Sequence, residues 1–188
     1  FETGRLHHWE SCAILAGRVA SDVDMGAGGN QPFPRRSDGK LWCFMDYETV
    51  SPEVFGASLR GFGFNILVTD VPRSARFLET VFGMTAHRVS ADFAIMAHGT
   101  YVMQLHADGT YAENPLLNLL PENPPRGAGI EIRLYDCDPD LAASRAEDAG
   151  GTILQDPTDK PHGLRECFIL CADGYAWVPS RPLSGVAG

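Results

Sequence analysis

Alternating apolar and polar positions mark two related strand-like segments. Residues 61–70 read GFGFNILVTD and residues 127–136 read GAGIEIRLYD, and both alternate in the way a half-buried strand does. Aligned at an offset of 66 residues (127 − 61), they share two glycines, an isoleucine and an aspartate. The matched pairs are Gly61 with Gly127, Gly63 with Gly129, Ile66 with Ile132, and Asp70 with Asp136. The pattern predicts two copies of one structural unit.

Each strand-like segment is followed by apolar residues at helical spacing. Residues 72–82 and 139–149 each place apolar side chains on one face, begin with proline and are followed by glycine. Three short strand candidates follow each helix: 86–90, 93–97 and 101–106 in the first half, and 152–154, 165–170 and 175–178 in the second. We therefore predict an α+β fold. Its paired βαβββ modules form curved mixed β-sheets around a cup.

The repeat also sets the expected boundaries. We expect an N-terminal extension (1–60), a repeat domain (61–182) and a short tail (183–188). The domain divides into module one (61–107), an irregular proline-rich linker (108–126) and module two (127–182). Within the extension we expect a helix near residues 6–16, a strand at 41–47 and a short helix at 51–59. Its large aromatic residues predict that it packs on the domain or on a partner subunit.

Composition narrows the classes of partner. The chain has 15 Lys+Arg and 24 Asp+Glu, a formal net charge of −9. Nucleic acids and anionic membranes attract basic surfaces, so we expect neither as a partner. No apolar run approaches the roughly 20 residues that a membrane span needs, and the first 25 residues lack the order of a secretory signal. The 5 cysteines are odd in number and form no C-x-x-C pair, which favours a reducing cytoplasm.

Two stretches resemble a known family. The segment from Asn65 to Gly83 is similar to the strand, aspartate and helix of the vicinal oxygen chelate superfamily, which contains glyoxalases, bleomycin resistance proteins and extradiol dioxygenases. Residues 161–165 (PHGLR) and 173–177 (DGYAW) resemble a later strand and hairpin of that family. His162 stands where the family usually has tryptophan, and Cys171 and Ala172 replace its usual Asp–Pro. The resemblance covers residues 61–182.

The resemblance implies where a metal would bind. Metal-dependent members take four ligands from four strands, and those positions fall here on Gly63, Gln104, Gly129 and Val178. Two glycines and a valine offer no side-chain donor to a metal. We therefore expect no metal and no cofactor, as in the bleomycin-resistance-like members that lack the metal site.

Strand alternation places polar side chains on the expected cup face. The ligand-binding candidates are Asn65, Leu67, Gln104, Glu131, Arg133 and Phe168. Thr69, His106, Glu166 and Ala176 share the same faces. Arg133 is the candidate for orienting an anionic group, because a guanidinium offers a planar fork to carboxylate or phosphate. The alternative is an internal network in which Arg133 pairs with Glu131 or Glu166. We expect His162 to be a turn residue at the rim, although an acid–base role is open to it.

Three hypotheses for function follow. The first is a metal-independent protein that binds a small polar organic molecule, in the manner that the bleomycin-resistance resemblance implies, and that forms a homodimer. The second is an enzyme, a lyase, isomerase or dioxygenase, with Glu131, Glu166 and His106 as candidate acid–base groups or as a displaced metal site. The third is an interaction module whose N-terminal extension fills the cup. The sequence leaves the catalytic residues unknown.

Overall fold

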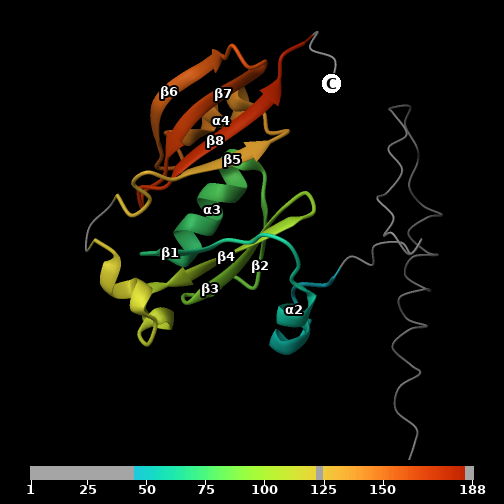
Figure 1. The fold of residues 1–188 in the computed structure, drawn as a ribbon, viewed down its shortest axis with the longest axis vertical. Helices are drawn as coiled ribbons and strands as arrows, with labels where there is room; N and C mark the ends of the chain where they lie inside the picture. Colours follow the sequence, from blue (N-terminus) through green and yellow to red (C-terminus); the bar gives the residue numbers. More distant parts are fainter. Residues whose placement is uncertain (1–44, 122–124, 185–188) are drawn as a thin grey trace, which may run out of the picture. The chain divides into compact units, whose positions relative to one another are not determined.

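The predicted pair of βαβββ modules is confirmed. A computed structural model describes residues 45–121 and 125–184 of the chain. The first module contains β1 (Asn65–Val68), α3 (Val71–Phe82), β2 (Thr85–His87), β3 (Phe93–His98) and β4 (Tyr101–Ala107). The second contains β5 (Glu131–Tyr135), α4 (Pro139–Ala146), β6 (Thr152–Asp159), β7 (Leu164–Leu170) and β8 (Ala176–Pro182). Figure 1 shows the two sheets with their helices.

Both modules have the same mixed topology. The strand orders are β1-β4-β3-β2 and β5-β8-β7-β6, with the first strand parallel to the last in each module. The 66-residue offset is preserved, because Asn65 begins β1 and Glu131 begins β5. Ile66 pairs with Leu105 and Ile132 pairs with Trp177, and all four side chains lie in the core. The sequence repeat is therefore a structural repeat.

α4 begins at Pro139 as predicted, and α3 begins at Val71, one residue before the predicted start. The Asp70 side chain accepts a hydrogen bond from the backbone N–H of Arg73 at 2.8 Å, and Asp138 caps α4 in the same way. α3 ends at Gly83, which adopts φ +66° and donates its N–H to Glu79 O. α4 ends at Ala146, shorter than the expected stretch to residue 149, because residues 147–150 turn toward β6.

The core lies on the helix-packed side of each sheet. α3 lies between the two sheets (Figure 1) and contacts the second one where the Phe82 ring meets Trp177 at 5.6 Å. Cys167 is buried as expected, and burial raises the pKa of its thiol to about 12. Tyr175 is also buried and donates its hydroxyl to Leu67 O of the first module at 2.9 Å. The opposite side of each sheet carries no helix from its own module, and we call it the helix-free face.

A buried carboxylate joins the modules. Asp173, in the turn before β8, accepts hydrogen bonds from the backbone N–H and hydroxyl of Thr69, just after β1. Its second oxygen accepts from Ser74 and lies 3.4 Å from Nη2 of Arg73, both in the first turn of α3. Thr69, expected on the cup face, is therefore committed to this junction.

Other segments differ from expectation in detail. The linker folds into two 3₁₀ turns, η1 (Asp108–Tyr111) and η2 (Pro115–Leu119). The short helix α2 (Pro52–Ser58) begins at the cap Ser51, and its Phe55 packs edge-on against Tyr47. Tyr47 lies in a turn, whereas the sequence predicted a strand there. The helix expected near residues 6–16 and most of the 41–47 strand lie outside the described residues. No helix in the described part of the chain is long and apolar enough to cross a membrane.

Candidate functional site

The helix-free face of the second module carries most of the charged candidates. Arg133 of β5 pairs with Val178 of β8, while Glu166 of β7 pairs with Ser180 of β8. Val178 and Ser180 are both fully buried. Since alternate residues of a strand share a face, Glu131, Arg133, Glu166 and Phe168 surround these two small residues. The register of β5, β8 and β7 thus places these four side chains on one face of the sheet, which is the grouping that the sequence predicted.

Arg133 is held between two carboxylates. Its Nη1 lies 3.1 Å from Oε2 of Glu131, and its Nη2 donates to Oε2 of Glu166. Glu166 sits two strands away, and the pair meets because the intervening β8 residues are small. The Glu166 side chain is 4% exposed and that of Arg133 is 26% exposed. Burial alone would lower the pKa of Arg133, but the hydrogen bond and charge of Glu166, together with the interactions with Glu131 and Tyr135, raise it. The internal network left open by the sequence is therefore present.

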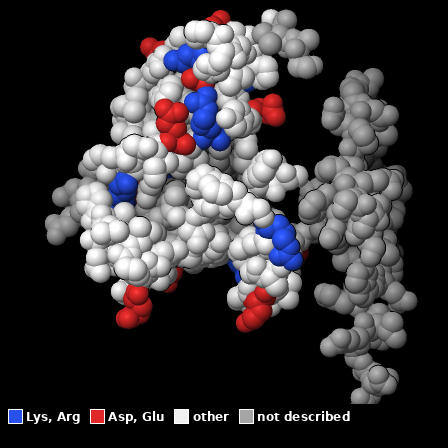
Figure 2. Space-filling view, viewed as in Figure 1, with Lys and Arg blue, Asp and Glu red and all other residues white. Residues whose placement is uncertain are grey.

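An imidazole completes this cluster. Nε2 of His162 lies 3.5 Å from Oε2 of Glu166, and the His162 side chain is 56% exposed. His162 occupies the turn between β6 and β7, as expected for a residue at the rim. Figure 2 shows basic and acidic side chains adjacent to each other on the second module. A buried carboxylate touching an exposed imidazole has the composition of an acid–base pair.

Sequence reasoning missed a second group on the same face. Lys160 places its Nζ 3.1 Å from Oε1 of Gln155 and 5.6 Å from the centroid of the Phe168 ring. Gln155 belongs to the part of β6 beyond residue 154, where the sequence predicted no strand. Phe168, predicted from alternation, is the one member of this group that the sequence identified.

The helix-free face of the first module is aromatic and mostly neutral. The His106 ring lies between the rings of Phe93, at 5.1 Å, and Tyr111, at 5.0 Å. Its Nδ1 contacts Thr110 Oγ1 at 3.4 Å, while its buried Nε2 has no hydrogen-bond partner in the described structure. Burial lowers the pKa of His106, which favours the neutral ring. Asn65 donates to the Tyr111 hydroxyl at 3.3 Å.

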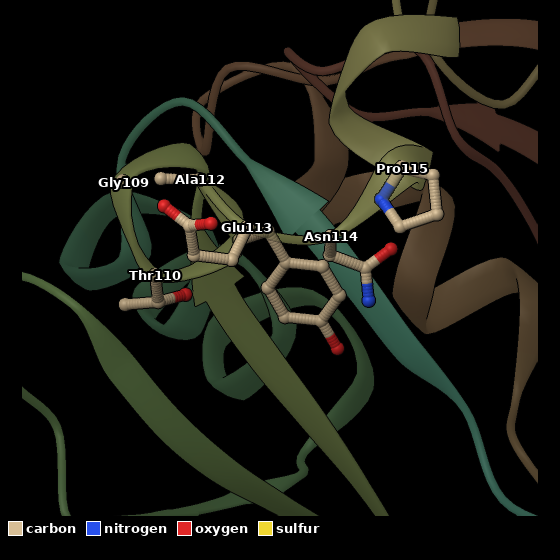
Figure 3. Close-up of a pocket in the computed structure, with 7 residues that line it drawn as sticks. Gly109, Thr110, Ala112, Glu113, Asn114 and Pro115 are labelled. Carbon is tan, nitrogen blue, oxygen red and sulfur yellow. The ribbon is translucent and has the colours of Figure 1, made fainter.

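A hollow of about 450 Å³ lies in the linker. It is lined by Gly109 through Pro115, Tyr111 included, and Figure 3 shows the Glu113 and Asn114 side chains among those that line it. Tyr111 therefore connects the hollow to the candidates Asn65 and His106. Gln104 lies beside Asn65 in the register of β4 and β1, and Leu67 lies beside His106.

The candidates form two groups, one in each module. Among the described residues, no hydrogen bond, ion pair or ring contact joins Asn65, Gln104 or His106 to Glu131, Arg133 or Glu166. Of the residues of the displaced metal site, His106 lies in the first module and Glu131 and Glu166 lie in the second. No three His, Cys, Asp or Glu side chains in the described ranges of this chain lie close enough to hold a metal ion. The superfamily's own metal positions fit no better. Gly63 and Gly129 lie ahead of β1 and β5, and Val178 presents buried hydrocarbon.

Comparison with known proteins decides the family. A sequence model of the glyoxalase/bleomycin resistance protein/dioxygenase superfamily matches residues 62–178. The chain belongs to this superfamily. The match spans both βαβββ modules of the superfamily domain and confirms the resemblance of the sequence to vicinal oxygen chelate proteins. No curated protein matches the chain.

Solved structures share the superfamily fold. A glyoxalase/bleomycin resistance protein/dioxygenase family enzyme from Burkholderia phytofirmans superposes with a TM-score of 0.54 at 20% identity, covering 64% of this chain and 97% of that one. A glyoxalase-related enzyme from Fulvimarina pelagi gives 0.53 at 17% identity, with coverages of 69% and 96%. A hypothetical protein from S. aureus gives 0.53 at 19% identity, with coverages of 68% and 98%. At these identities the likeness concerns the fold alone.

Proposed function

We propose that this member of the superfamily binds a small polar organic molecule on the helix-free face of its second module, without the metal site of its metal-dependent relatives. The observation that carries the proposal is the makeup of that face. Glu166 is nearly inaccessible and Arg133 half-buried, beside an apolar floor of Val178 and Phe168. Charged groups are costly to withdraw from water, and their placement beside an apolar surface is typical of ligand sites.

The first module contributes to the same proposal through a homodimer. Asn65, Leu67 and Gln104 lie on the helix-free face of the first module, and in the described chain no hydrogen bond or ion pair joins them to Glu131, Arg133 or Glu166. A second copy would bring such a face opposite the charged one, and large exposed aromatic residues such as Phe62 and Tyr101 offer apolar area for association. Light scattering coupled to size-exclusion chromatography tests this part, and a monomer at all concentrations would contradict it.

An acid–base enzyme is the alternative, favoured by the contact between His162 and Glu166. In that case Glu166 or Glu131 exchanges a proton with a bound substrate, as a lyase or isomerase requires. His106 is less suited, because two aromatic rings enclose it. The three described cysteines are free thiols, which supports our proposal of a reducing, cytoplasmic location.

Methyl-resolved NMR titration with a library of small organic molecules tests the binding proposal. Binding at the proposed face should shift the Val178 methyl signals and leave those of Val81, in the α3 core, unchanged. Shifts confined to other surfaces, or none across the library, would contradict it. Glu166→Gln separates the two functions. A binding protein retains ligand selectivity in this variant, whereas an acid–base enzyme loses turnover of whatever ligand it converts.

A further inference from the structure

Lys160 has no counter-ion in the part of the chain that the structure describes. Among the described residues no carboxylate forms an ion pair with it, and its polar contact is the amide oxygen of Gln155 at 3.1 Å. Its side chain is half-buried over the Phe168 ring. The chain has only two lysines, Lys40 and Lys160, so this cation is chemically distinct from the arginines that make the ion pairs.

The nearby carboxylates are already used. Asp159, the preceding residue, accepts from Nη1 of Arg165 at 2.7 Å. Glu166 accepts from Arg133 and contacts His162. Arg133 is itself matched by two carboxylates, so it has little capacity left for an anionic ligand. Among the side chains of this face in residues 125–184, Lys160 therefore supplies the positive charge that makes no ion pair.

A strand irregularity creates the group. Ile153 pairs with Ile169, but Gln155 pairs with Phe168, so the register of β6 shifts by one residue between them. Without the shift Gln155 would share the core side with Ile153; with it, Gln155 stands opposite Phe168 on the helix-free face. β-Bulges recur beside functional sites, where they re-aim a side chain. Because Oε1 of Gln155 accepts from Lys160, the amide NH₂ of Gln155 remains available to donate.

We propose that Lys160, Gln155 and Phe168 form an anion-binding subsite for a small organic acid whose apolar part lies along the Phe168 ring. Lys160 supplies the charge, and the Gln155 NH₂ supplies a second donor to the same anion. A carboxylate and a phosphate share this chemistry. The inference rests on the proposed ligand-binding function and moves anion recognition from Arg133 to Lys160.

The test compares three probes of similar shape: benzoate, benzamide and phenyl phosphate. Each is titrated against the full chain while the Val178 methyl and Phe168 ring signals are followed by NMR. The variants are Lys160→Met and the matched control Arg76→Met, which removes one exposed positive charge from α3. Benzoate should bind about tenfold more tightly than benzamide, the equivalent of one charge-assisted hydrogen bond. If phenyl phosphate binds more tightly than benzoate, the anionic group that the subsite recognises is a phosphate.

Lys160→Met should abolish the preference for the anion and Arg76→Met should retain it. If Lys160→Met does not fold, the salt dependence of binding to the wild-type protein tests the same preference. Added salt should weaken the affinity for benzoate, which depends on charge, and leave the affinity for benzamide unchanged. Equal affinity for benzoate and benzamide at this face, or an unchanged preference in Lys160→Met, overturns the subsite and leaves the binding function standing. If neither these probes nor any library molecule shifts the face, both proposals fall.

Discussion

Asp173 of the second module accepts two hydrogen bonds from Thr69 of the first through a single oxygen, at 2.9 Å from the backbone N–H and 2.7 Å from the hydroxyl. The carboxylate is 1% exposed, and its other oxygen accepts from Ser74. Asp173 therefore accepts hydrogen bonds from donor groups of Thr69 and Ser74, at the start of α3, that have no acceptor within the first module in the described structure. The superfamily hairpin that the sequence resembles thus acts as a structural junction between the modules.

Replacing this carboxylate should destabilise the whole domain. Asp173→Asn keeps the shape but removes the charge and one acceptor from a buried site with several donors. We expect a loss of about 3 kcal/mol in the free energy of unfolding, as for other buried charged partners. Urea denaturation measures it. Asp148→Asn, at an exposed position, is the matched control and should change stability little. Equal stability of the two variants would contradict the junction role.

The neighbouring turn tolerates only glycine. Gly174 adopts φ +80°, and a Cβ atom there would overlap the Cα atom of Pro125. Gly99 adopts φ +58° with open space around it. Gly99→Ala should therefore cost about 1 kcal/mol from backbone conformation alone. Gly174→Ala should cost roughly 3 kcal/mol or more, because overlap is added to strain. Thermal or chemical unfolding compares the two, and similar losses would show that the Pro125 contact relaxes freely.

The Arg133–Glu166 pair should behave as a coupled unit. Arg133→Met leaves a nearly inaccessible carboxylate without its cation, and we expect a loss of about 2–4 kcal/mol. Adding Glu166→Gln should restore much of that loss, because the stranded charge is then gone. A double-mutant cycle by urea denaturation measures the coupling. Additive effects of the two substitutions would mean that Arg133 and Glu166 do not stabilise one another.

Stability should fall in acid partly through Asp140. Both oxygens of this carboxylate accept hydrogen bonds from Arg165, at 2.7 and 2.8 Å, and these bonds lower the pKa of Asp140 to about 2 from 3.8. A lowered pKa stabilises the fold above the unfolded-state value, and that contribution disappears as pH falls from about 4 toward 2. Asp140→Asn should flatten the pH dependence of the urea midpoint in this window. Asp148→Asn should leave the slope unchanged, and an unaltered slope in Asp140→Asn would contradict the assignment.

The repeat was readable from sequence because its signals are local. Pro72 and Pro139 stand in the first turns of α3 and α4, so the start of each helix could be predicted to within a residue. Strand β6 could not be followed beyond residue 154, since Asp156 and Pro157 disfavour strands and the register shifts have no local signal. Gln155 and Lys160 were missed for that reason. Arg133 pairs with Glu166 because of the order and register of β5, β8 and β7. The alternation of residues along one strand does not reveal how neighbouring strands pair, so the sequence left open whether Arg133 binds a ligand or Glu166.

The irregular course of β6 also governs association at the sheet edge. β6 is the outermost strand of its sheet, and Pro157 offers no N–H to a further strand. Two register shifts twist the strand away from a straight template. Both features disfavour the addition of a further strand beside β6. An open sheet edge can aggregate by pairing with strands of other molecules. The irregular course of β6 protects the edge that carries Gln155 from this kind of aggregation.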